Sequence, residues 1–329
     1  MAKRRLTKQQ SRRIKNNIIS RQQQGSSTNQ DSGITTLTGL VISHHGKSLI
    51  VEDDHGKSFR CTSRQNIGNP VCGDHVVWQQ TGNAEGVIMA IRDRSSLRVR
   101  PGFGTRIKPV AANLTWMCIT IAPEPEPQET QIDRYLVAAE HLNIKPTIIC
   151  NKTDLLDEDA LTDWHTRFSC YMDIGYEVLY TSTKLENGIA ELKVVLKGNV
   201  SILVGQSGVG KSSLINSLIP DISARVSDLS SQITKGQHTT SHSQLYHLPG
   251  QGGDLIDSPG VRDFQLGHLD RQAVEHGFID FRPYLGKCKF SDCKHVSEPD
   301  CAILEAVANR QINAHRLASF QSIVTSSIN

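Results

Sequence analysis

Residues 205–213 read Gly-Gln-Ser-Gly-Val-Gly-Lys-Ser-Ser, between an apolar run at 200–204 and a helical pattern at 211–218. This is the phosphate-loop pattern in its strand–loop–helix setting. Its glycines let backbone N–H groups wrap phosphates, and the start of the helix adds partial positive charge. We expect Lys211 to reach the β and γ phosphates and Ser212 to bind Mg²⁺. The stretch predicts a nucleotide-binding domain, with a chance glycine-rich turn as the alternative.

The sequence on either side of this loop alternates apolar strand runs with helical patterns from residue 98 to residue 272. Such alternation is typical of a parallel sheet with helices on both faces. We therefore predict a central α/β domain over 98–272. Its expected strands lie at 114–121, 147–150, 178–181, 200–204 and 254–256, and its expected helices include 189–196 and 211–218.

A second motif, Asn-Lys-Thr-Asp at 151–154, directly follows an expected strand. Loops at the carboxyl ends of the strands form the ligand crevice of an open α/β sheet. The two carboxylate oxygens of Asp154 can accept from guanine N1–H and its 2-amino group, a donor pair that adenine lacks. We expect Lys152 to lie along the base and Asn151 to tie this loop to the phosphate loop. Alone, the tetrapeptide can also simply cap a helix.

Two more segments complete the nucleotide site. Asp-Ser-Pro-Gly at 257–260 has the form D-x-x-G, in which Asp257 holds Mg²⁺ through water and the Gly260 N–H senses the γ-phosphate, although the same residues suit a simple turn. Thr-Ser-Thr-Lys at 181–184 resembles the loop whose backbone reads guanine O6. The expected GTP contacts are Asn151, Lys152, Thr153, Asp154, Ser182, Thr183, Lys184, Gly205, Gln206, Ser207, Gly208, Val209, Gly210, Lys211, Ser212 and Ser213.

The order of these motifs is unusual. In an ordinary small GTPase the phosphate loop comes first, whereas here the two guanine-reading loops precede it, so we predict a circularly permuted GTPase domain. The polar stretch 236–240, Gly-Gln-His-Thr-Thr, is where a switch segment must supply a Thr to Mg²⁺. Val261 stands where many GTPases carry a water-orienting Gln. His238 is the candidate for that role, and an inert loop histidine is the alternative.

The chain before residue 98 has a different character. Five short strand patterns, separated by Gly-rich turns, occupy 34–97 and favour a small OB-fold barrel, with an SH3-like barrel as the alternative. Residues 1–33 hold eight Lys or Arg residues against one acid, Asp31. Such a segment predicts a disordered arm attracted to phosphate, or a solubilising tail. Apolar runs are too short for a membrane span, so we expect a soluble protein.

Three cysteines and a histidine gather in the C-terminal region, 273–329, which otherwise has a helical pattern from 301 to 323. Cys288, Cys293, His295 and Cys301 provide the ligand types of a closed Cys₃His structural zinc site. Free thiols and a surface histidine are the alternative. We therefore predict an α-helical zinc-binding domain.

Together these features resemble the ribosome small-subunit-dependent GTPase A family, also called RsgA or YjeQ. The resemblance covers residues 34 to about 310 and rests on the motifs at 151–154, 205–213, 236–240 and 257–260 and on the Cys/His set. It implies a bacterial cytoplasmic GTPase with an N-terminal OB-fold, a permuted GTPase domain and a C-terminal zinc domain. Such proteins bind the 30S subunit late in its maturation, and the subunit stimulates hydrolysis.

The resemblance also carries over roles for individual residues. The switch histidine of the family falls on His238 and its magnesium-binding Thr on Thr240 rather than Thr239, while Ser241 replaces a third Thr of many members. The expected catalytic residues are His238, Lys211, Thr240 and Gly260, and the expected magnesium ligands are Ser212, Thr240 and Asp257.

The implied cofactors are GTP or GDP, Mg²⁺ and one structural Zn²⁺. The implied partner is the 30S subunit with its 16S rRNA, bound by a monomer that does not associate with membranes and is released after hydrolysis. Two other classes stay open at this point: a ribosome-binding scaffold with inert nucleotide, and a permuted GTPase that acts on the large subunit or at membranes.

Overall fold

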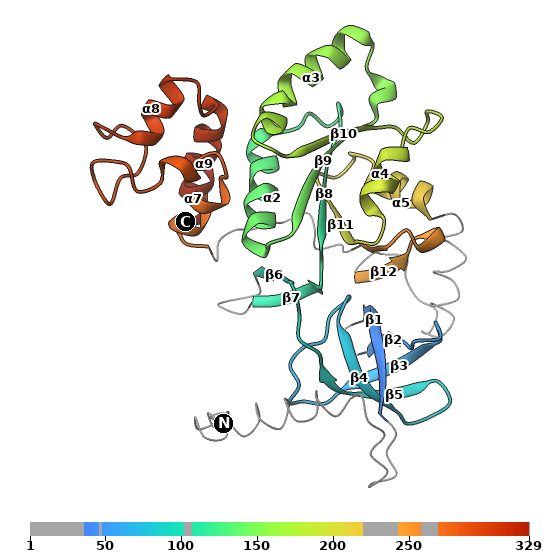
Figure 1. Ribbon diagram of the computed structural model, residues 1–329. Coiled ribbons are helices and arrows are strands. Elements are labelled where there is room, and N and C mark those ends of the chain that lie inside the picture. Colours follow the sequence, from blue (N-terminus) through green and yellow to red (C-terminus); the bar gives the residue numbers. More distant parts are fainter. Residues whose placement is uncertain (1–35, 46–47, 102–106, 220–242, 258–268, 329) are drawn as a thin grey trace. The chain divides into compact units, whose positions relative to one another are not determined.

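The computed structural model describes residues 36–45, 48–101, 107–219, 243–257 and 269–328 (Figure 1). The chain divides into two compact units, Met1–Ser95 and Ser96–Asn329. The expected basic tail, 1–33, and the expected loop residues His238, Thr240 and Gly260 lie outside the described residues. Among the described residues, no helix combines the length and the apolar character that crossing a bilayer demands.

The first unit contains a five-stranded barrel. Its strands are β1 (Leu37–His45), β2 (Ser48–Glu52), β3 (Ser58–Ser63), β4 (His75–Gln80) and β5 (Glu85–Ile91). β1 pairs antiparallel with both β2 and β4, β3 pairs parallel with β5, and β4 pairs antiparallel with β5. These pairings close the ring in the order β1–β2–β3–β5–β4. The barrel is therefore OB-like, as the sequence predicted.

Alternate residues of these strands fill the barrel interior. Trp78 lies at its centre, fully buried, with its ring centroid 4.6 Å from that of Phe59. Gly86 of β5 faces this indole so closely that a Cβ would come within 2.6 Å of the Trp78 ring. The tryptophan therefore fits only because a neighbouring strand carries no side chain at that point.

The second unit is built on a six-stranded sheet in the order β10–β9–β8–β11–β13–β12, in which β12 runs antiparallel to β13 and the other pairs are parallel. The strands are β8 (Trp116–Ile121), β9 (Lys145–Asn151), β10 (Glu177–Thr181), β11 (Val200–Val204), β12 (Ser243–His247) and β13 (Asp254–Asp257). The strand that carries the phosphate loop, β11, thus lies in the middle of the sheet.

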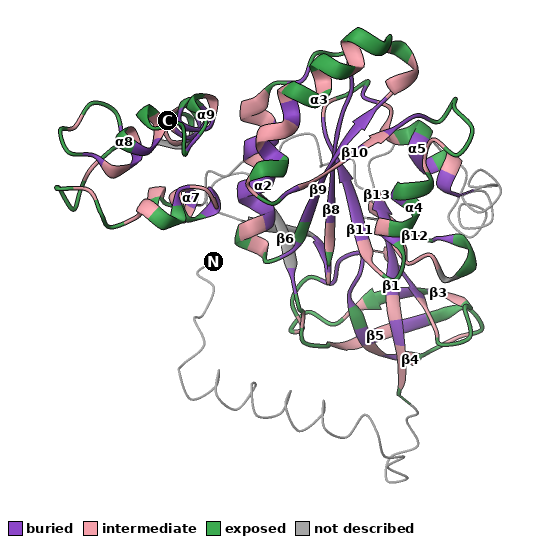
Figure 2. Cartoon of the chain, turned by 45° about the horizontal axis from the view of Figure 1, so that its top comes forward, coloured by how far each residue is buried: buried purple, intermediate pink, exposed green. Residues whose placement is uncertain are grey.

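Helices cover both faces of this sheet. They are α2 (Glu129–Leu142), α3 (Glu158–Asp173), α4 (Ala190–Leu196) and α5 (Lys211–Leu218). Figure 1 shows α2 and α3 on one face and α4 and α5 on the other. Leucines of α4 and α5 pack with Cys118, Ile149 and Leu203 in one buried cluster. Figure 2 shows the same division, with buried residues along the strands and on the inner sides of the helices.

Three strands lie where none was predicted from the sequence. β6 (Leu97–Pro101) and β7 (Ile107–Ala112) form a separate antiparallel ribbon, and β12 lies in a stretch for which no element was predicted. In β12 only Leu245 is buried, so the strand lacks the apolar alternation that a sequence search detects.

The C-terminal region contains α7 (Arg271–Gly277), α8 (Ala302–Ala308) and α9 (Ala314–Ile328). The helical pattern expected over 301–323 is therefore interrupted. Arg310, with a φ of 59°, takes the left-handed conformation after α8, and the Asn313 side chain accepts from the His315 N–H at the start of α9. Both α7 and α9 contact α2, one of the helices that cover the sheet.

Candidate nucleotide and metal sites

Three loops meet at the carboxyl edge of the central sheet, since Asn151, Thr181 and Gly205 end or follow the parallel strands β9, β10 and β11. The open α/β sheet places its ligand crevice at this edge. The sequence motifs at 151–154, 181–184 and 205–213 therefore lie together, although about fifty residues separate the first from the last.

The phosphate loop has the backbone conformation that its glycines allow. Gly205, Gly208 and Gly210 have φ values of 139°, 89° and 94°, which other residues rarely adopt. At Gly205 a Cβ would collide with the carbonyl of Thr120 on β8. The Lys211 ammonium donates to the carbonyls of Gly205 (2.8 Å) and Gln206 (2.5 Å). The lysine therefore lies across its own loop, at the first turn of α5.

Asn151 connects the phosphate loop to the guanine-reading loops. Its side chain is buried; its Nδ2 donates to the Val209 carbonyl at 2.9 Å, and its Oδ1 accepts from the Thr181 hydroxyl at 3.1 Å. A Cβ at Gly210 would collide with this same amide nitrogen. One buried amide thus fixes three loops relative to one another, and Gly210 makes room for it.

Asp154 is held in place by two residues of the next loop. The Ser182 hydroxyl donates to Asp154 Oδ1 at 2.5 Å, and the Lys184 ammonium lies 3.2 Å from Oδ2. These contacts, first the serine hydroxyl and then the lysine, lower the pKa of the Asp154 carboxyl. The side chain is therefore an oriented carboxylate at neutral pH, which can accept two N–H donors from the edge of a base.

Other expected site residues are placed around this crevice. Lys152 donates to the carbonyl of Glu124 at 2.9 Å, and Thr153 donates to the carbonyl of Thr181 at 3.2 Å. Ser212 and Ser213 lie exposed on the first turn of α5, and Asp257 is the last residue of β13. Thr183, Ser207 and Gly208 are exposed.

Two groups that border the crevice were not predicted from the sequence. One is the Glu124 carbonyl, which belongs to residues 122–128, Ala-Pro-Glu-Pro-Glu-Pro-Gln, between β8 and α2; we name this segment the proline loop. The other is the Thr181 hydroxyl, which positions Asn151. The three alternating prolines after a strand are a signal for a rigid loop at the ligand edge, whereas a backbone acceptor leaves no trace in the sequence.

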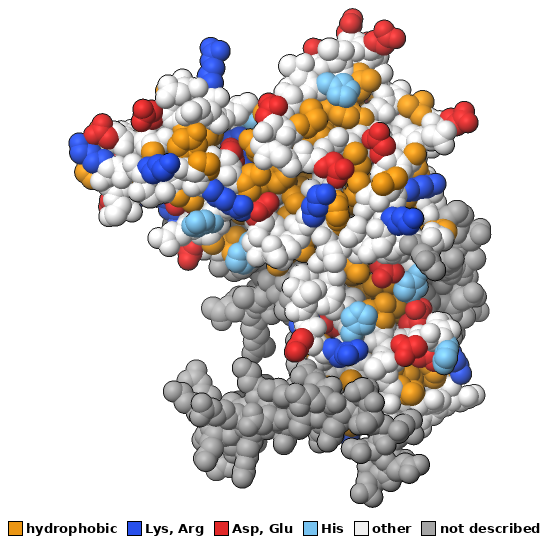
Figure 3. All heavy atoms as spheres, in the orientation of Figure 1, with side chains coloured by type: hydrophobic (Ala, Val, Ile, Leu, Met, Phe, Trp, Pro, Cys, Tyr) orange, Lys and Arg blue, Asp and Glu red, His pale blue; other side chains and the backbone are white. Residues whose placement is uncertain are grey.

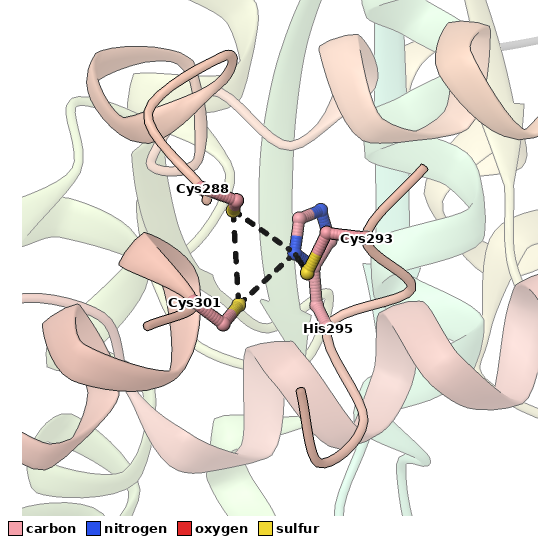
Figure 4. A group of neighbouring side chains, drawn as sticks. All are labelled: Cys288, Cys293, His295 and Cys301. Atoms are coloured by element: carbon pink, nitrogen blue, oxygen red, sulfur yellow. Dashed lines mark hydrogen bonds between the residues drawn. The ribbon is translucent and has the colours of Figure 1, made fainter. Parts of the chain in front are cut away.

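The four expected zinc ligands of the C-terminal region lie together (Figure 4). Their sulfur and Nδ1 atoms are all within 4.8 Å of one another. The His295 Nδ1 is 3.7, 3.4 and 3.2 Å from the sulfurs of Cys288, Cys293 and Cys301, and the sulfurs of Cys288 and Cys301 are 3.8 Å apart. Ligand atoms of a tetrahedral Zn²⁺ with ordinary bond lengths are about 3.5–3.8 Å apart. The cluster therefore fits a structural zinc ion.

Groups behind the cluster also suit a metal. Glu275 Oε1 lies 3.5 Å from the second ring nitrogen of His295, and Gln321 donates to the His295 carbonyl at 2.7 Å. A carboxylate behind a ligating histidine fixes its orientation. Arg271 holds Glu275 at 2.8 Å and also donates to the Cys293 carbonyl. The ligands are thus anchored to both α7 and α9.

Comparison with known proteins gives consistent matches. The family model described as RsgA GTPase matches residues 91–267. A protein named "Small ribosomal subunit biogenesis GTPase RsgA" from Ectopseudomonas mendocina is 47% identical over 293 residues, which cover 88% of this chain and 85% of that one. Its namesake from Pseudomonas aeruginosa strain LESB58 is 45% identical over 337 residues, covering 99% of this chain and 98% of its own.

Solved structures give a similar result. The crystal structure of YjeQ from Thermotoga maritima matches with a TM-score of 0.73 at 31% identity and covers 90% of this chain and 99% of that one. YloQ, described as a circularly permuted GTPase, matches with a TM-score of 0.70 at 27% identity, over 92% of this chain and 98% of its own.

Proposed function

Because this chain belongs to the RsgA GTPase family and is therefore a GTP-hydrolysing enzyme, we propose that it binds GTP in the crevice between residues 151–154 and 205–213 and acts in biogenesis of the small ribosomal subunit. One observation supports the nucleotide site most strongly. The buried Asn151 amide joins the phosphate loop to the loop that carries Asp154. A base and its phosphates can then be held by one rigid set of loops.

The residues around the crevice divide the substrate between them. Asp154, oriented by Ser182, accepts from guanine N1–H and its 2-amino group. Adenine has no such pair of donors, so the carboxylate favours guanine. Backbone N–H groups of the phosphate loop and the Lys211 ammonium hold the phosphates. Thr153, Thr183, Lys184, Gln206, Ser207 and Ser213 border the same site.

For hydrolysis, Lys211 stabilises the charge that develops on the phosphate oxygens. Ser212, Asp257 and Thr240 hold Mg²⁺, which neutralises phosphate charge when bound. Gly260 senses the γ-phosphate, and His238 orients the attacking water in place of the glutamine that Val261 replaces. The roles of Thr240, Gly260 and His238 rest on the motif pattern.

The ribosomal part of the proposal rests on the names of relatives at high coverage and on charge. Those relatives are named as biogenesis GTPases of the small subunit. Eight basic residues lie in the first 33 residues of this chain, and OB-like barrels frequently bind nucleic acids. Figure 3 shows Lys and Arg side chains, mixed with acidic ones, on the C-terminal region. We propose the 30S subunit and its 16S rRNA as partner, bound by a cytoplasmic monomer.

We also propose that Cys288, Cys293, His295 and Cys301 hold one structural Zn²⁺. The site is closed, with four protein ligands, so its role is to hold the loops of the C-terminal region together. The division into a tail at 1–33, a barrel at 34–97, a GTPase domain at 98–272 and a zinc domain at 273–329 is part of the same proposal.

The deciding experiment measures GTP turnover by the purified chain alone, with purified 30S subunits and with purified 50S subunits. We expect a low rate alone and a large increase with 30S only. Stimulation by 50S, or none by either, would remove the small-subunit assignment and leave the GTPase intact. If mant-GDP failed to bind to the purified chain, the assignment of the nucleotide site itself would be refuted.

A further inference from the structure

The proline loop, residues 122–128, contacts both halves of the nucleotide site. Through the Glu124 carbonyl it accepts from the Lys152 ammonium of the guanine-reading loop, at 2.9 Å. Its Pro125 faces the phosphate loop, where a Cβ at Gly208 would lie 3.4 Å from the Pro125 Cδ. The position of this loop therefore sets where the Lys152 ammonium lies in the expected nucleotide site.

One side chain from another element fixes that loop. Arg167 of α3 donates from Nη2 to the Pro127 carbonyl at 3.1 Å and from Nε to Glu129 Oε1 at 2.8 Å, and its Nη1 lies 3.5 Å from Glu126 Oε1. Its side chain is 33% exposed, and its guanidinium lies 5.4 Å from the Phe168 ring centre. The planar guanidinium thus spans the end of the loop and the first turn of α2, using the fork geometry that arginine offers and lysine does not.

Charge gives this contact a second effect. The proline loop and the start of α2 carry Glu124, Glu126 and Glu129 within six residues. Arg167 is the cation that lies next to two of these carboxylates. Beside a loop built to hold polyphosphate, unneutralised carboxylates repel the ligand, although solvent weakens the effect at the exposed Glu126.

We propose that Arg167 is a positioning residue for guanine nucleotides. It touches no expected nucleotide contact itself; it holds the proline loop where the Glu124 carbonyl fixes Lys152. The inference rests on the proposed function, namely that this crevice binds guanine nucleotides. It assigns Arg167 to affinity for the nucleotide and not to the hydrolytic step, because the Glu124 carbonyl that it helps to hold accepts from Lys152 of the guanine-reading loop.

The test compares Arg167→Met with the original chain by titration of fluorescent mant-GDP and mant-GTP. Losing one charge-assisted network of this kind should raise Kd by about three- to tenfold. The single-turnover rate at saturating GTP should stay within about twofold, since bound nucleotide still meets the same phosphate loop. Arg167→Lys keeps the charge and loses the fork, so its Kd should lie between those of the other two proteins.

Two further variants separate positioning from general stability. Arg282→Met removes a comparable surface pair, Arg282 to Glu140 at 2.7 Å, elsewhere in the same unit and should leave Kd unchanged. In a Lys152→Met background, Arg167→Met should add less than about a twofold change, because the contact it serves is already gone. A melting curve of each variant checks that it is folded; if Arg167→Met is not, Arg167→Lys, which keeps the charge and loses the fork, takes its place.

The proposal is overturned if Arg167→Met leaves Kd unchanged, if it lowers the saturating rate instead, or if its effect is undiminished without Lys152. An equal loss of affinity in Arg282→Met overturns it as well. Each of these outcomes compares a variant with the original chain and therefore concerns Arg167 alone. If the original chain itself fails to bind mant-GDP, the proposed nucleotide site is refuted instead.

Discussion

Arg316 supports our most quantitative prediction, because it joins the C-terminal region to the nucleotide-binding sheet. It lies on α9 and is 1% exposed. Its guanidinium is 2.5 Å from Asp133 of α2 and 2.7 Å from Asp280, whose side chains are 0% and 3% exposed. Its Cζ also lies 4.4 Å from the ring centre of Phe278. We expect Arg316→Met, which keeps the stem and removes the cation, to leave two buried carboxylates without their cationic partner.

The size of the loss follows from this burial. Removing one partner of a buried ion pair costs about 3–5 kcal/mol, and a surface pair costs less than about 1 kcal/mol. For a unit of this size, such a loss corresponds to a fall in Tm on the order of 10 °C. Replacing all three charges, as Asp133→Asn, Asp280→Asn and Arg316→Met together, should recover most of the loss, because no unpaired charge then stays buried.

The loss should also depend on pH. Burial raises the pKa of the Asp133 carboxyl, and the Arg316 guanidinium opposes that rise. Without the guanidinium, the folded-state pKa rises further above the unfolded value of about 3.9, so the folded state binds more protons than the unfolded state. The stability of Arg316→Met relative to the original chain should therefore increase as the pH falls from about 7 through the raised pKa of Asp133.

Calorimetry of the full chain at about pH 5.5 and 7.5, with hydrogen exchange of α9 peptides, measures both effects. Arg134→Met, on the same helix as Asp133 with its guanidinium bonded to Ser326, is the matched control for an exposed contact between the same helices. A loss below about 1 kcal/mol, or one that is identical at both pH values, would refute the reasoning.

Three other substitutions and the removal of the metal give further tests. Asp154→Asn should shift the preference from GTP to xanthosine triphosphate, because the amide nitrogen donates where the base then offers a carbonyl; competition against mant-GDP measures it, and retained preference for GTP contradicts the assignment. Gly210→Ala should weaken mant-GDP binding by more than about tenfold, because the new Cβ collides with the Asn151 amide; unchanged affinity would show that the loops move apart at no cost. Gly86→Ala should lower the stability of the barrel by about 1–3 kcal/mol, since its Cβ would lie 2.6 Å from the Trp78 ring, and urea unfolding that matches the original chain would contradict this. Strong chelators should remove one Zn²⁺ per chain, counted by elemental analysis, and speed hydrogen exchange at α8; a purified chain without zinc would refute the metal assignment.

The nucleotide loops were accessible from sequence because their chemistry is local. Phosphate binding requires glycines at fixed spacing between a strand and a helix, and Gly205 to Lys211 show that spacing directly. Parallel strands then bring the ends of β9 and β11 to one edge, so the meeting of Asn151 with Val209 followed from topology. The OB-like barrel followed from five short strand patterns separated by turns.

Other contacts were not accessible because they depend on distance in space alone. Arg316 meets Asp133 across 183 residues of chain, and nothing near either residue marks the pairing. The Glu124 carbonyl acts through its backbone, which every residue possesses. The break between α8 and α9 depends on a left-handed Arg310, a conformation that arginine rarely adopts and its letter does not signal.

The docking of α7 and α9 on α2 limits how the protein can be divided. Gly277 of α7 lies so close to Val137 of α2 that a Cβ would come within 2.7 Å of it, and Val137 is fully buried. Truncating the chain just before α7 would expose that apolar surface. It would also leave the Asp133 carboxylate without the Arg316 cation. The nucleotide-binding sheet and the C-terminal region thus share buried surface, and removing one leaves buried groups of the other exposed.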